Sequence, residues 1–101
     1  MEKTFKNKVG VITGGASGIG KATAIAFASR GAKVVIVDVT EHSEILNLIQ
    51  NMGEEAVFIQ CDVSDTVQVK AMIEKTIATF GTIDFAFNNA GIEGESATTQ
   101  E

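Results

Sequence analysis

The chain has 101 residues, of which 45% are apolar and 21% are charged, a balance typical of a globular protein and not of a disordered one. Its formal net charge of −5 argues against general affinity for nucleic acid, which needs clustered lysine and arginine side chains. Cys61 has no second cysteine to pair with, the N-terminal residues MEKTFKNK lack the apolar stretch of a secretory signal, and no apolar run suggests a membrane span, so we expect a cytoplasmic protein without a membrane partner.

The first third of the chain predicts a strand, a helix and a second strand. The apolar run Val9–Thr13 indicates a short buried strand, which a glycine-rich turn follows. The residues up to about Arg30 are rich in alanine, and such small side chains suit a helix packed closely on a sheet. We expect Gly31 to end that helix. The segment Lys33–Asp38, KVVIVD, contains four consecutive β-branched residues, which predict a strand buried on both faces.

A second helix and a third strand are expected next. Thr40 is a suitable N-cap and Gly53 a suitable end for the helix. Its predicted apolar stripe consists of Ile45, Leu48, Ile49 and Met52. The segment Ala56–Gln60, AVFIQ, predicts the third strand.

A third helix and a fourth strand complete the pattern. Ser64 or Asp65 is expected to cap the helix, since Asp65 and Gln68 have the spacing of a capping box. Its predicted buried stripe consists of Val69, Ile73, Ile77 and Phe80, and Gly81 is expected to end it. Residues 83–88, IDFAFN, predict the fourth strand, and residues 92–101 predict a loop.

This strict alternation of strands and helices predicts an α/β fold in which right-handed crossovers build a parallel sheet covered by helices. We interpret residues 1–91 as one domain and residues 92–101 as a loop beyond it. The fourth strand is apolar on both faces, and as the edge of a four-stranded sheet it would favour pairing with another chain. We expect a homo-oligomer.

The stretch GGASGIGKAT at residues 14–23 has the composition of a phosphate-binding turn, because glycines let the backbone approach a phosphate at the N-terminus of a helix. Gly15, Gly20 and Lys21 have the spacing of a nucleoside triphosphate loop. That loop requires a serine or threonine directly after the lysine as a magnesium ligand, and here the residue is Ala22. The triphosphate interpretation is therefore disfavoured, and we expect no metal site.

A dinucleotide needs an acid at the end of the second strand, where it accepts hydrogen bonds from the adenosine ribose. Asp38 stands there, 18 residues after Gly20. Its charge would repel a 2′-phosphate by up to about 4 kcal/mol at a separation of about 4 Å, and Ser17 and Val39 offer no basic group to offset this repulsion. The residues thus favour NAD over NADP.

The glycine spacing is G-x-x-x-G-x-G, not the general G-x-G-x-x-G, so the residues alone indicate only a nucleotide cofactor with a ribose. An S-adenosylmethionine site would also place acids after the second and third strands, at Asp38 and Asp62. Thr13 argues against that site, since an acid usually stands at its position.

With these features together, the chain resembles the N-terminal part of the short-chain dehydrogenase/reductase family. The resemblance covers residues 8–91 and depends on four motifs in the family's order. They are Thr13-Gly14-Gly15-Ala16-Ser17-Gly18-Ile19-Gly20, Asp38, Asp62-Val63 and Asn88-Asn89-Ala90-Gly91. It implies a Rossmann-type, doubly wound parallel sheet, with strand order 3-2-1-4 and three helices in this chain.

The resemblance also implies roles for individual residues. The pyrophosphate and adjoining riboses of NAD would contact Gly14, Ser17, Gly18, Ile19 and Gly20. Asp38 would bind the adenosine ribose, and Asp62 with the backbone of Val63 would contact the adenine. The floor of the cofactor site would be formed by Asn89, Ala90 and Gly91. Residues 1–91 would then be an NAD-binding half-domain.

Members of the family transfer a hydride between nicotinamide and a carbonyl or secondary alcohol. Four residues catalyse this reaction: a tyrosine, a lysine four residues later, a serine and an asparagine. All of these would lie beyond Glu101, and this chain contains no tyrosine. The resemblance therefore implies an NAD(H)-dependent oxidoreductase whose catalytic half is absent from the chain, with a small carbonyl or alcohol as substrate partner. Two alternatives stay open: a non-enzymatic nucleotide-binding or interaction module, and an S-adenosylmethionine-binding methyltransferase half-domain.

Overall fold

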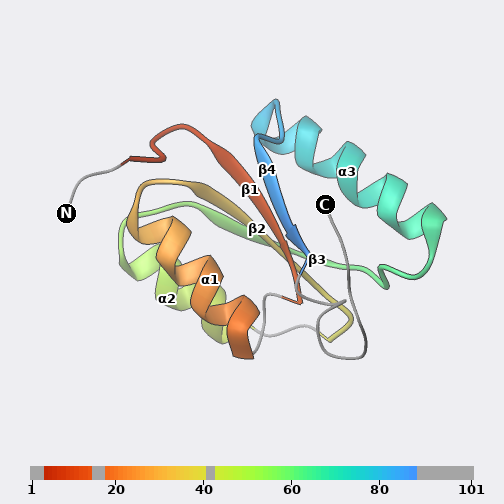
Figure 1. Ribbon diagram of the computed structural model, residues 1–101, viewed down its shortest axis with the longest axis horizontal. Coiled ribbons are helices and arrows are strands. Elements are labelled where there is room, and N and C mark those ends of the chain that lie inside the picture. Colours follow the sequence, from red (N-terminus) through yellow and green to blue (C-terminus); the bar gives the residue numbers. More distant parts are fainter. Residues whose placement is uncertain (1–3, 15–17, 41–42, 89–101) are drawn as a thin grey trace.

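Strands and helices alternate along the whole described part of the chain (Figure 1). The computed structural model describes residues 4–14, 18–40 and 43–88. In chain order the elements are β1 (Val9–Thr13), α1 (Gly18–Ser29), β2 (Lys33–Asp38), α2 (Ser43–Asn51), β3 (Ala56–Gln60), α3 (Thr66–Phe80) and β4 (Phe85–Asn88). The expected order of elements is confirmed.

The strands form one parallel sheet in the order β3-β2-β1-β4. Helices α1 and α2 cover one face of this sheet, and α3 covers the other (Figure 1). The change of face follows from the handedness of the crossovers. The chain moves outward from β1 to β3 and then returns across the sheet to β4. Because every crossover is right-handed, connections that move across the sheet in opposite directions place their helices on opposite faces. The fold is thus the Rossmann-type sheet that the sequence predicts.

The core has two layers, because alternate residues of the central strands point to opposite faces. Ile12 and Ile36 pack with the alanines and isoleucines of α1 and α2, whereas Val11 and Val35 pack toward α3. Burial on both faces explains why β2 is apolar throughout its centre.

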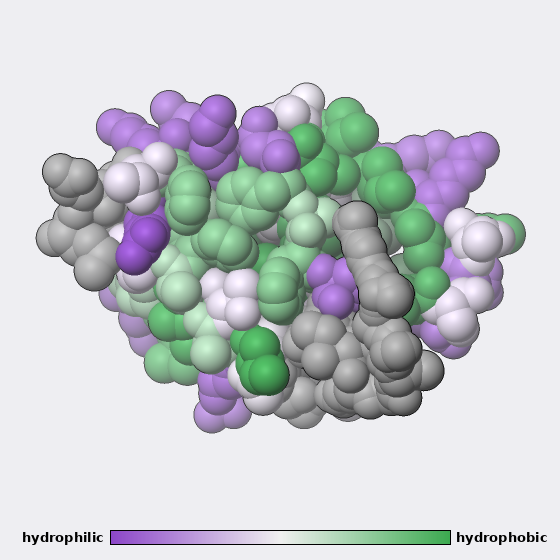
Figure 2. All heavy atoms as spheres, viewed as in Figure 1, coloured by the Kyte–Doolittle hydropathy of each residue, from purple (hydrophilic) through white to green (hydrophobic). Residues whose placement is uncertain are grey.

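The apolar stripe predicted for α3 is wrong at its centre. Met72 and Thr76 form the buried face, and the Thr76 hydroxyl donates to the backbone carbonyl of Met72, 2.9 Å away. Ile73 and Ile77 are instead 39% and 47% exposed. Figure 2 shows apolar side chains gathered along α3 on this face of the molecule. Successive residues differ by about 100° around a helix, so Ile73 and Ile77 lie beside the buried face and not on it.

The prediction for α2 is correct for Ile45 and Ile49, which are fully buried, but Leu48 and Met52 are about 40% exposed (42% and 39%). The helix is described from Ser43 onward, and the two residues between Thr40 and Ser43 lie outside the described residues, so the capping role of Thr40 stays a prediction. A helix on the outer side of a three-layer fold needs only a narrow buried stripe, because its remaining surface faces solvent.

Strand β4 is shorter than predicted, beginning at Phe85. The segment before it is held by Asp84, whose carboxylate accepts from the backbone N–H of Val9 and whose own N–H donates to the Val9 carbonyl, both at 2.8 Å. Within the described residues, β4 pairs with β1 alone and forms an edge of the sheet. The ring of Phe85 packs with Phe5 and Phe27 on the α1 face.

Candidate functional site

The carboxyl ends of the four parallel strands meet at one edge of the sheet, and the N-terminus of α1 lies at the same edge (Figure 1). Strand β1 is the point at which the chain's direction across the sheet reverses, since its neighbours β2 and β4 belong to crossovers on opposite faces. Ligands of open α/β sheets bind outside the carboxyl ends of the strands at such a switch point.

The start of α1 leaves space for a ligand to approach the protein backbone closely. Gly18 has φ +59°, and apart from its chain neighbours and the nearby backbone of its own helix no described atom lies within 4 Å of the position that a Cβ would occupy. Ile19 is 62% exposed beside it, while Gly20 is buried against the sheet. Gly14, with φ +68°, donates its N–H to the Val37 carbonyl at 2.7 Å, which joins the end of β1 to β2. Residue Ser17, also predicted here, lies outside the described residues.

The carboxylate of Asp38 ends β2 at this edge. Its Oδ1 accepts from the backbone N–H of Val39 at 2.8 Å, and its backbone carbonyl accepts from the N–H of Cys61 at 2.9 Å. The side-chain amide of Gln60 donates to the Val39 carbonyl at 2.9 Å. Sequence reasoning missed Gln60, because a glutamine at the end of a strand carries no motif.

Asp62 and Val63 follow β3 at the same edge. Asp62 Oδ1 accepts from the hydroxyl of Ser64 at 2.7 Å and from its backbone N–H at 3.0 Å. These two bonds stabilise the ionised form and lower the pKa of Asp62. The side chain of Val63 is 38% exposed. Cys61, just before them, is almost fully buried, and burial, together with the nearby carboxylates Asp62 and Asp65, raises the pKa of its thiol.

The predicted capping box at the start of α3 is present in a modified form. Asp65 accepts from the N–H groups of Val67 and Gln68, as an N-cap does. In a standard capping box Gln68 would accept from the N–H of Asp65, but here that N–H donates to the Asp62 carbonyl. The Oε1 of Gln68 instead accepts from the N–H of Asp62, at 2.8 Å. The cap therefore fixes the backbone of Asp62 as well as the helix.

A hydrogen bond between side chains joins β1 to β4 at the switch point. The hydroxyl of Thr13 donates to Asn88 Oδ1 at 2.8 Å, so the last residue of each strand holds the other. The predicted site residues Asn89, Ala90 and Gly91 come directly after this bond but lie outside the described residues.

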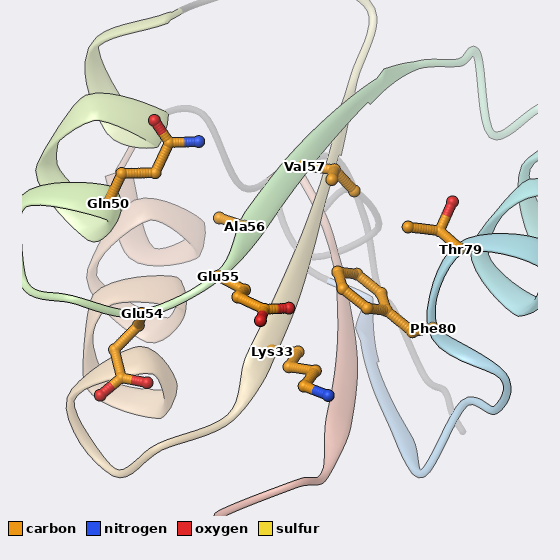
Figure 3. A pocket seen from close by; sticks show the side chains of 8 residues that line it. All are labelled: Lys33, Gln50, Glu54, Glu55, Ala56, Val57, Thr79 and Phe80. Atoms are coloured by element: carbon orange, nitrogen blue, oxygen red, sulfur yellow. The ribbon is translucent and has the colours of Figure 1, made fainter.

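The opposite edge of the sheet carries a separate hollow of about 460 Å³ (Figure 3). Lys33 and Phe80 face each other across it, with the Lys33 ammonium 5.9 Å from the centre of the Phe80 ring. Glu54 and Glu55 border the same hollow. None of the predicted site residues lines it. Among the described residues no helix is long and apolar enough to cross a membrane, and no group of three or more histidine, cysteine, aspartate or glutamate residues could hold a metal ion.

The described edge suits a nucleotide with a ribose. An open, glycine-lined helix N-terminus accommodates phosphate. Two carboxylates lie at the ends of neighbouring strands: Asp38 is the last residue of β2, and Asp62 is the second residue after β3. A parallel sheet with this order and this switch point defines a Rossmann-type α/β protein.

Comparison with known proteins identifies the family. The family model described as short chain dehydrogenase matches residues 8–101. The chain therefore belongs to the short-chain dehydrogenase/reductase family, as its motifs predict.

Individual relatives share its sequence over nearly its whole length. The chain is 43% identical over 100 residues to a (+)-cis,cis-nepetalactol synthase of Nepeta racemosa, covering 98% of this chain and 37% of that protein. It is 39% identical over 103 residues to a cyclohexanol dehydrogenase of an Acinetobacter species, covering 100% of this chain and 41% of that protein. The crystal structure of a hydroxysteroid dehydrogenase from Escherichia coli superposes with a TM-score of 0.86 at 32% identity, over 98% of this chain and 43% of the other. The chain thus spans about two fifths of the relatives that it matches.

Proposed function

We propose that this chain forms the NAD(H)-binding part of an oxidoreductase in which a hydride passes between nicotinamide and a carbonyl or secondary alcohol. Membership of the family supports a nicotinamide cofactor, and relatives named as dehydrogenases support an oxidoreductase. Three relatives are named nepetalactol synthases, so the redox reaction is part of the proposal and is not given by the family alone.

The carboxylate of Asp38 is the observation that carries the choice of NAD. It stands at the end of β2, and the Val39 N–H orients one of its oxygens. A ribose diol donates two hydrogen bonds to such an acceptor, each worth about 1.5–3 kcal/mol because the acceptor is charged. A 2′-phosphate would bring a second negative charge to the same place, and the exposed neighbour Val39 offers no cation to offset it.

The remaining residues complete the proposed site. The N–H groups at the start of α1, from Gly18 onward, would hold the pyrophosphate, together with Gly14 and the undescribed Ser17. The ionised Asp62 and the Val63 backbone would contact the adenine, and residues 89–91 would form the floor. When bound, the nicotinamide ring supplies the hydride chemistry, while these residues bind and orient the cofactor.

The chemical step requires a proton donor or acceptor beside the substrate oxygen. The family's tyrosine has no counterpart here, since the 101 residues contain none. We place that group, its lysine and the substrate contacts in residues outside this sequence, and residues 1–91 in the cofactor-binding half. A cytoplasmic location and a homo-oligomeric state are parts of the same proposal; the first draws on the unpaired cysteine and the second on the edge position of β4. The family match does not favour the alternatives, a non-catalytic module or a methyltransferase half-domain.

Cofactor titration of the natural full-length polypeptide tests this proposal. We expect it to bind NADH at least about tenfold more tightly than NADPH, since that ratio corresponds to about 1.4 kcal/mol, well below the repulsion available to Asp38. Asp38→Asn should weaken NADH binding about tenfold and reduce the preference for NADH to about threefold or less. Glu74→Gln, which removes an exposed carboxylate on α3, is the matched control and should change neither value. A preference for NADPH, or equal preferences in the wild type and Asp38→Asn, would overturn the assignment, and preferential binding of S-adenosylmethionine would replace it.

A further inference from the structure

A glutamine side chain extends the contact between β2 and β3 beyond their last paired residues. The final pair of the parallel ladder is Asp38 with Gln60. After this pair the N–H of Cys61 donates to the Asp38 carbonyl at 2.9 Å, and Gln60 Nε2 donates to the Val39 carbonyl, also at 2.9 Å. The carbonyls of Asp38, the last residue of β2, and of Val39, the residue after it, are therefore held by Cys61 and Gln60, the bond from Gln60 being made through its side chain.

These bonds determine how the Asp38 carboxylate is presented. Asp38 Oδ1 is oriented by the N–H of Val39 at 2.8 Å, so the direction of the carboxylate depends on the conformation of Val39. The bond from Gln60 fixes the carbonyl of the same residue. The Val39 side chain is 55% exposed, so packing contributes little to holding it. The backbone of Val39 is thus restrained by hydrogen bonds at both its N–H and its C=O.

We propose that Gln60 is a positioning residue for the adenosine ribose: by holding the Val39 carbonyl, it keeps the turn after β2 in the conformation that directs the Asp38 carboxylate toward the ribose hydroxyls. This inference rests on the proposed function of Asp38. Gln60 itself acts through Val39 and touches no reacting group. Its amide can donate to a carbonyl across the edge, which the side chain of Met, of nearly equal length, cannot do.

The effect of losing this bond is a change in population. A turn that spends only about a third of its time in the competent conformation weakens binding about threefold, because the apparent dissociation constant rises as the competent fraction falls. The loss applies only to ligands that use the Asp38 carboxylate. A ligand without ribose hydroxyls should bind equally well with or without the restraint.

The experiment compares two cofactors on the natural full-length polypeptide: NAD, and its analogue in which the adenosine ribose lacks both hydroxyls. The wild type should bind NAD at least about tenfold more tightly than the dideoxy analogue. Gln60→Met should lower this ratio to about a third of the wild-type value, entirely through weaker NAD binding. Gln60→Ala is the second variant and should behave in the same way. Gln50→Met, which changes an exposed glutamine of α2 at the other edge of the sheet, is the matched control and should keep the wild-type ratio.

The outcomes separate the two hypotheses. A wild type that binds both cofactors equally would overturn the ribose role of Asp38 and this inference with it. If the wild type binds NAD more tightly than the dideoxy analogue and both Gln60 variants keep the wild-type ratio, the inference alone would be overturned. Equal weakening of both cofactors, together with a lower melting temperature, would show a purely structural role for Gln60 and would also overturn it.

Discussion

Replacing Gly10 with alanine tests the packing between β1 and β4 directly. Gly10 pairs with Phe85 in the parallel ladder, and the Phe85 ring lies over the glycine. An added Cβ would contact Phe85 Cε1 most closely, with Cζ at 2.8 Å and Cδ1 at 3.0 Å. The ring cannot easily move aside, because its centre lies 5.6 Å from that of Phe5 and 4.7 Å from that of Phe27.

Two opposing effects set the magnitude. Alanine is more favourable than glycine in the middle of a strand by about 0.5–1 kcal/mol. Overpacking of a well-filled core costs about 1–3 kcal/mol. We therefore expect Gly10→Ala to lower the free energy of unfolding by about 1–2 kcal/mol, so that steric overlap outweighs the gain in strand propensity.

Denaturant unfolding of the natural full-length polypeptide measures this change, with Phe85→Leu as the partner substitution. In the Phe85→Leu background the overlap is removed, and Gly10→Ala should be neutral or stabilising. The coupling between the two sites should exceed about 1 kcal/mol, as expected for residues in contact. If Gly10→Ala stabilises the wild type, or costs the same in both backgrounds, the proposed overlap does not exist.

Two further predictions concern the turn before α3. Ser64→Ala removes the shorter of the two bonds to Asp62 and should raise the pKa of Asp62 toward its ordinary value. Because the folded-state pKa is lowered, this group stabilises the fold above its unfolded pKa of about 3.9 and loses that contribution as the pH falls through the folded value. NMR titration of the carboxyl carbon checks the shift, and an unchanged pKa would show that the hydroxyl is not responsible. Asp65→Ala should lower the free energy of unfolding by about 0.5–2 kcal/mol through loss of the N-cap, while Asp65→Asn should keep most of it. Chemical denaturation distinguishes the two, and equal losses would contradict capping by the side-chain oxygen.

The sequence was most informative where burial leaves one possible structure. β2 is buried on both faces, so its β-branched run predicts a strand with correct ends. The alternation of strands and helices predicts a parallel sheet, so the glycine turn and Asp38 could be placed at the carboxyl ends of their strands. The order of the strands came from the resemblance to the family and not from the alternation.

Other features depend on contacts that no local pattern contains. The buried face of α3 includes Thr76, which periodicity would reject, because its hydroxyl is satisfied within the helix by the Met72 carbonyl. The role proposed for Gln60 depends on a backbone carbonyl 21 residues earlier in the chain, in a turn whose shape cannot be read from residue types.

The bonds between β1 and β4 connect residues that lie far apart in the sequence, which has a consequence for folding. The Thr13–Asn88 and Val9–Asp84 hydrogen bonds each join residues 75 positions apart, at opposite ends of the same strand pair. Such distant pairing is slow to form, because a long segment must be ordered before its contacts are made. The part of the site between the carboxyl ends of β1 and β4 forms only when these two strands pair. The ability to bind the cofactor would therefore mark the completed sheet. A cofactor present during synthesis would then act on the last stage of folding, by mass action on the finished edge and not by guiding the strands that precede it.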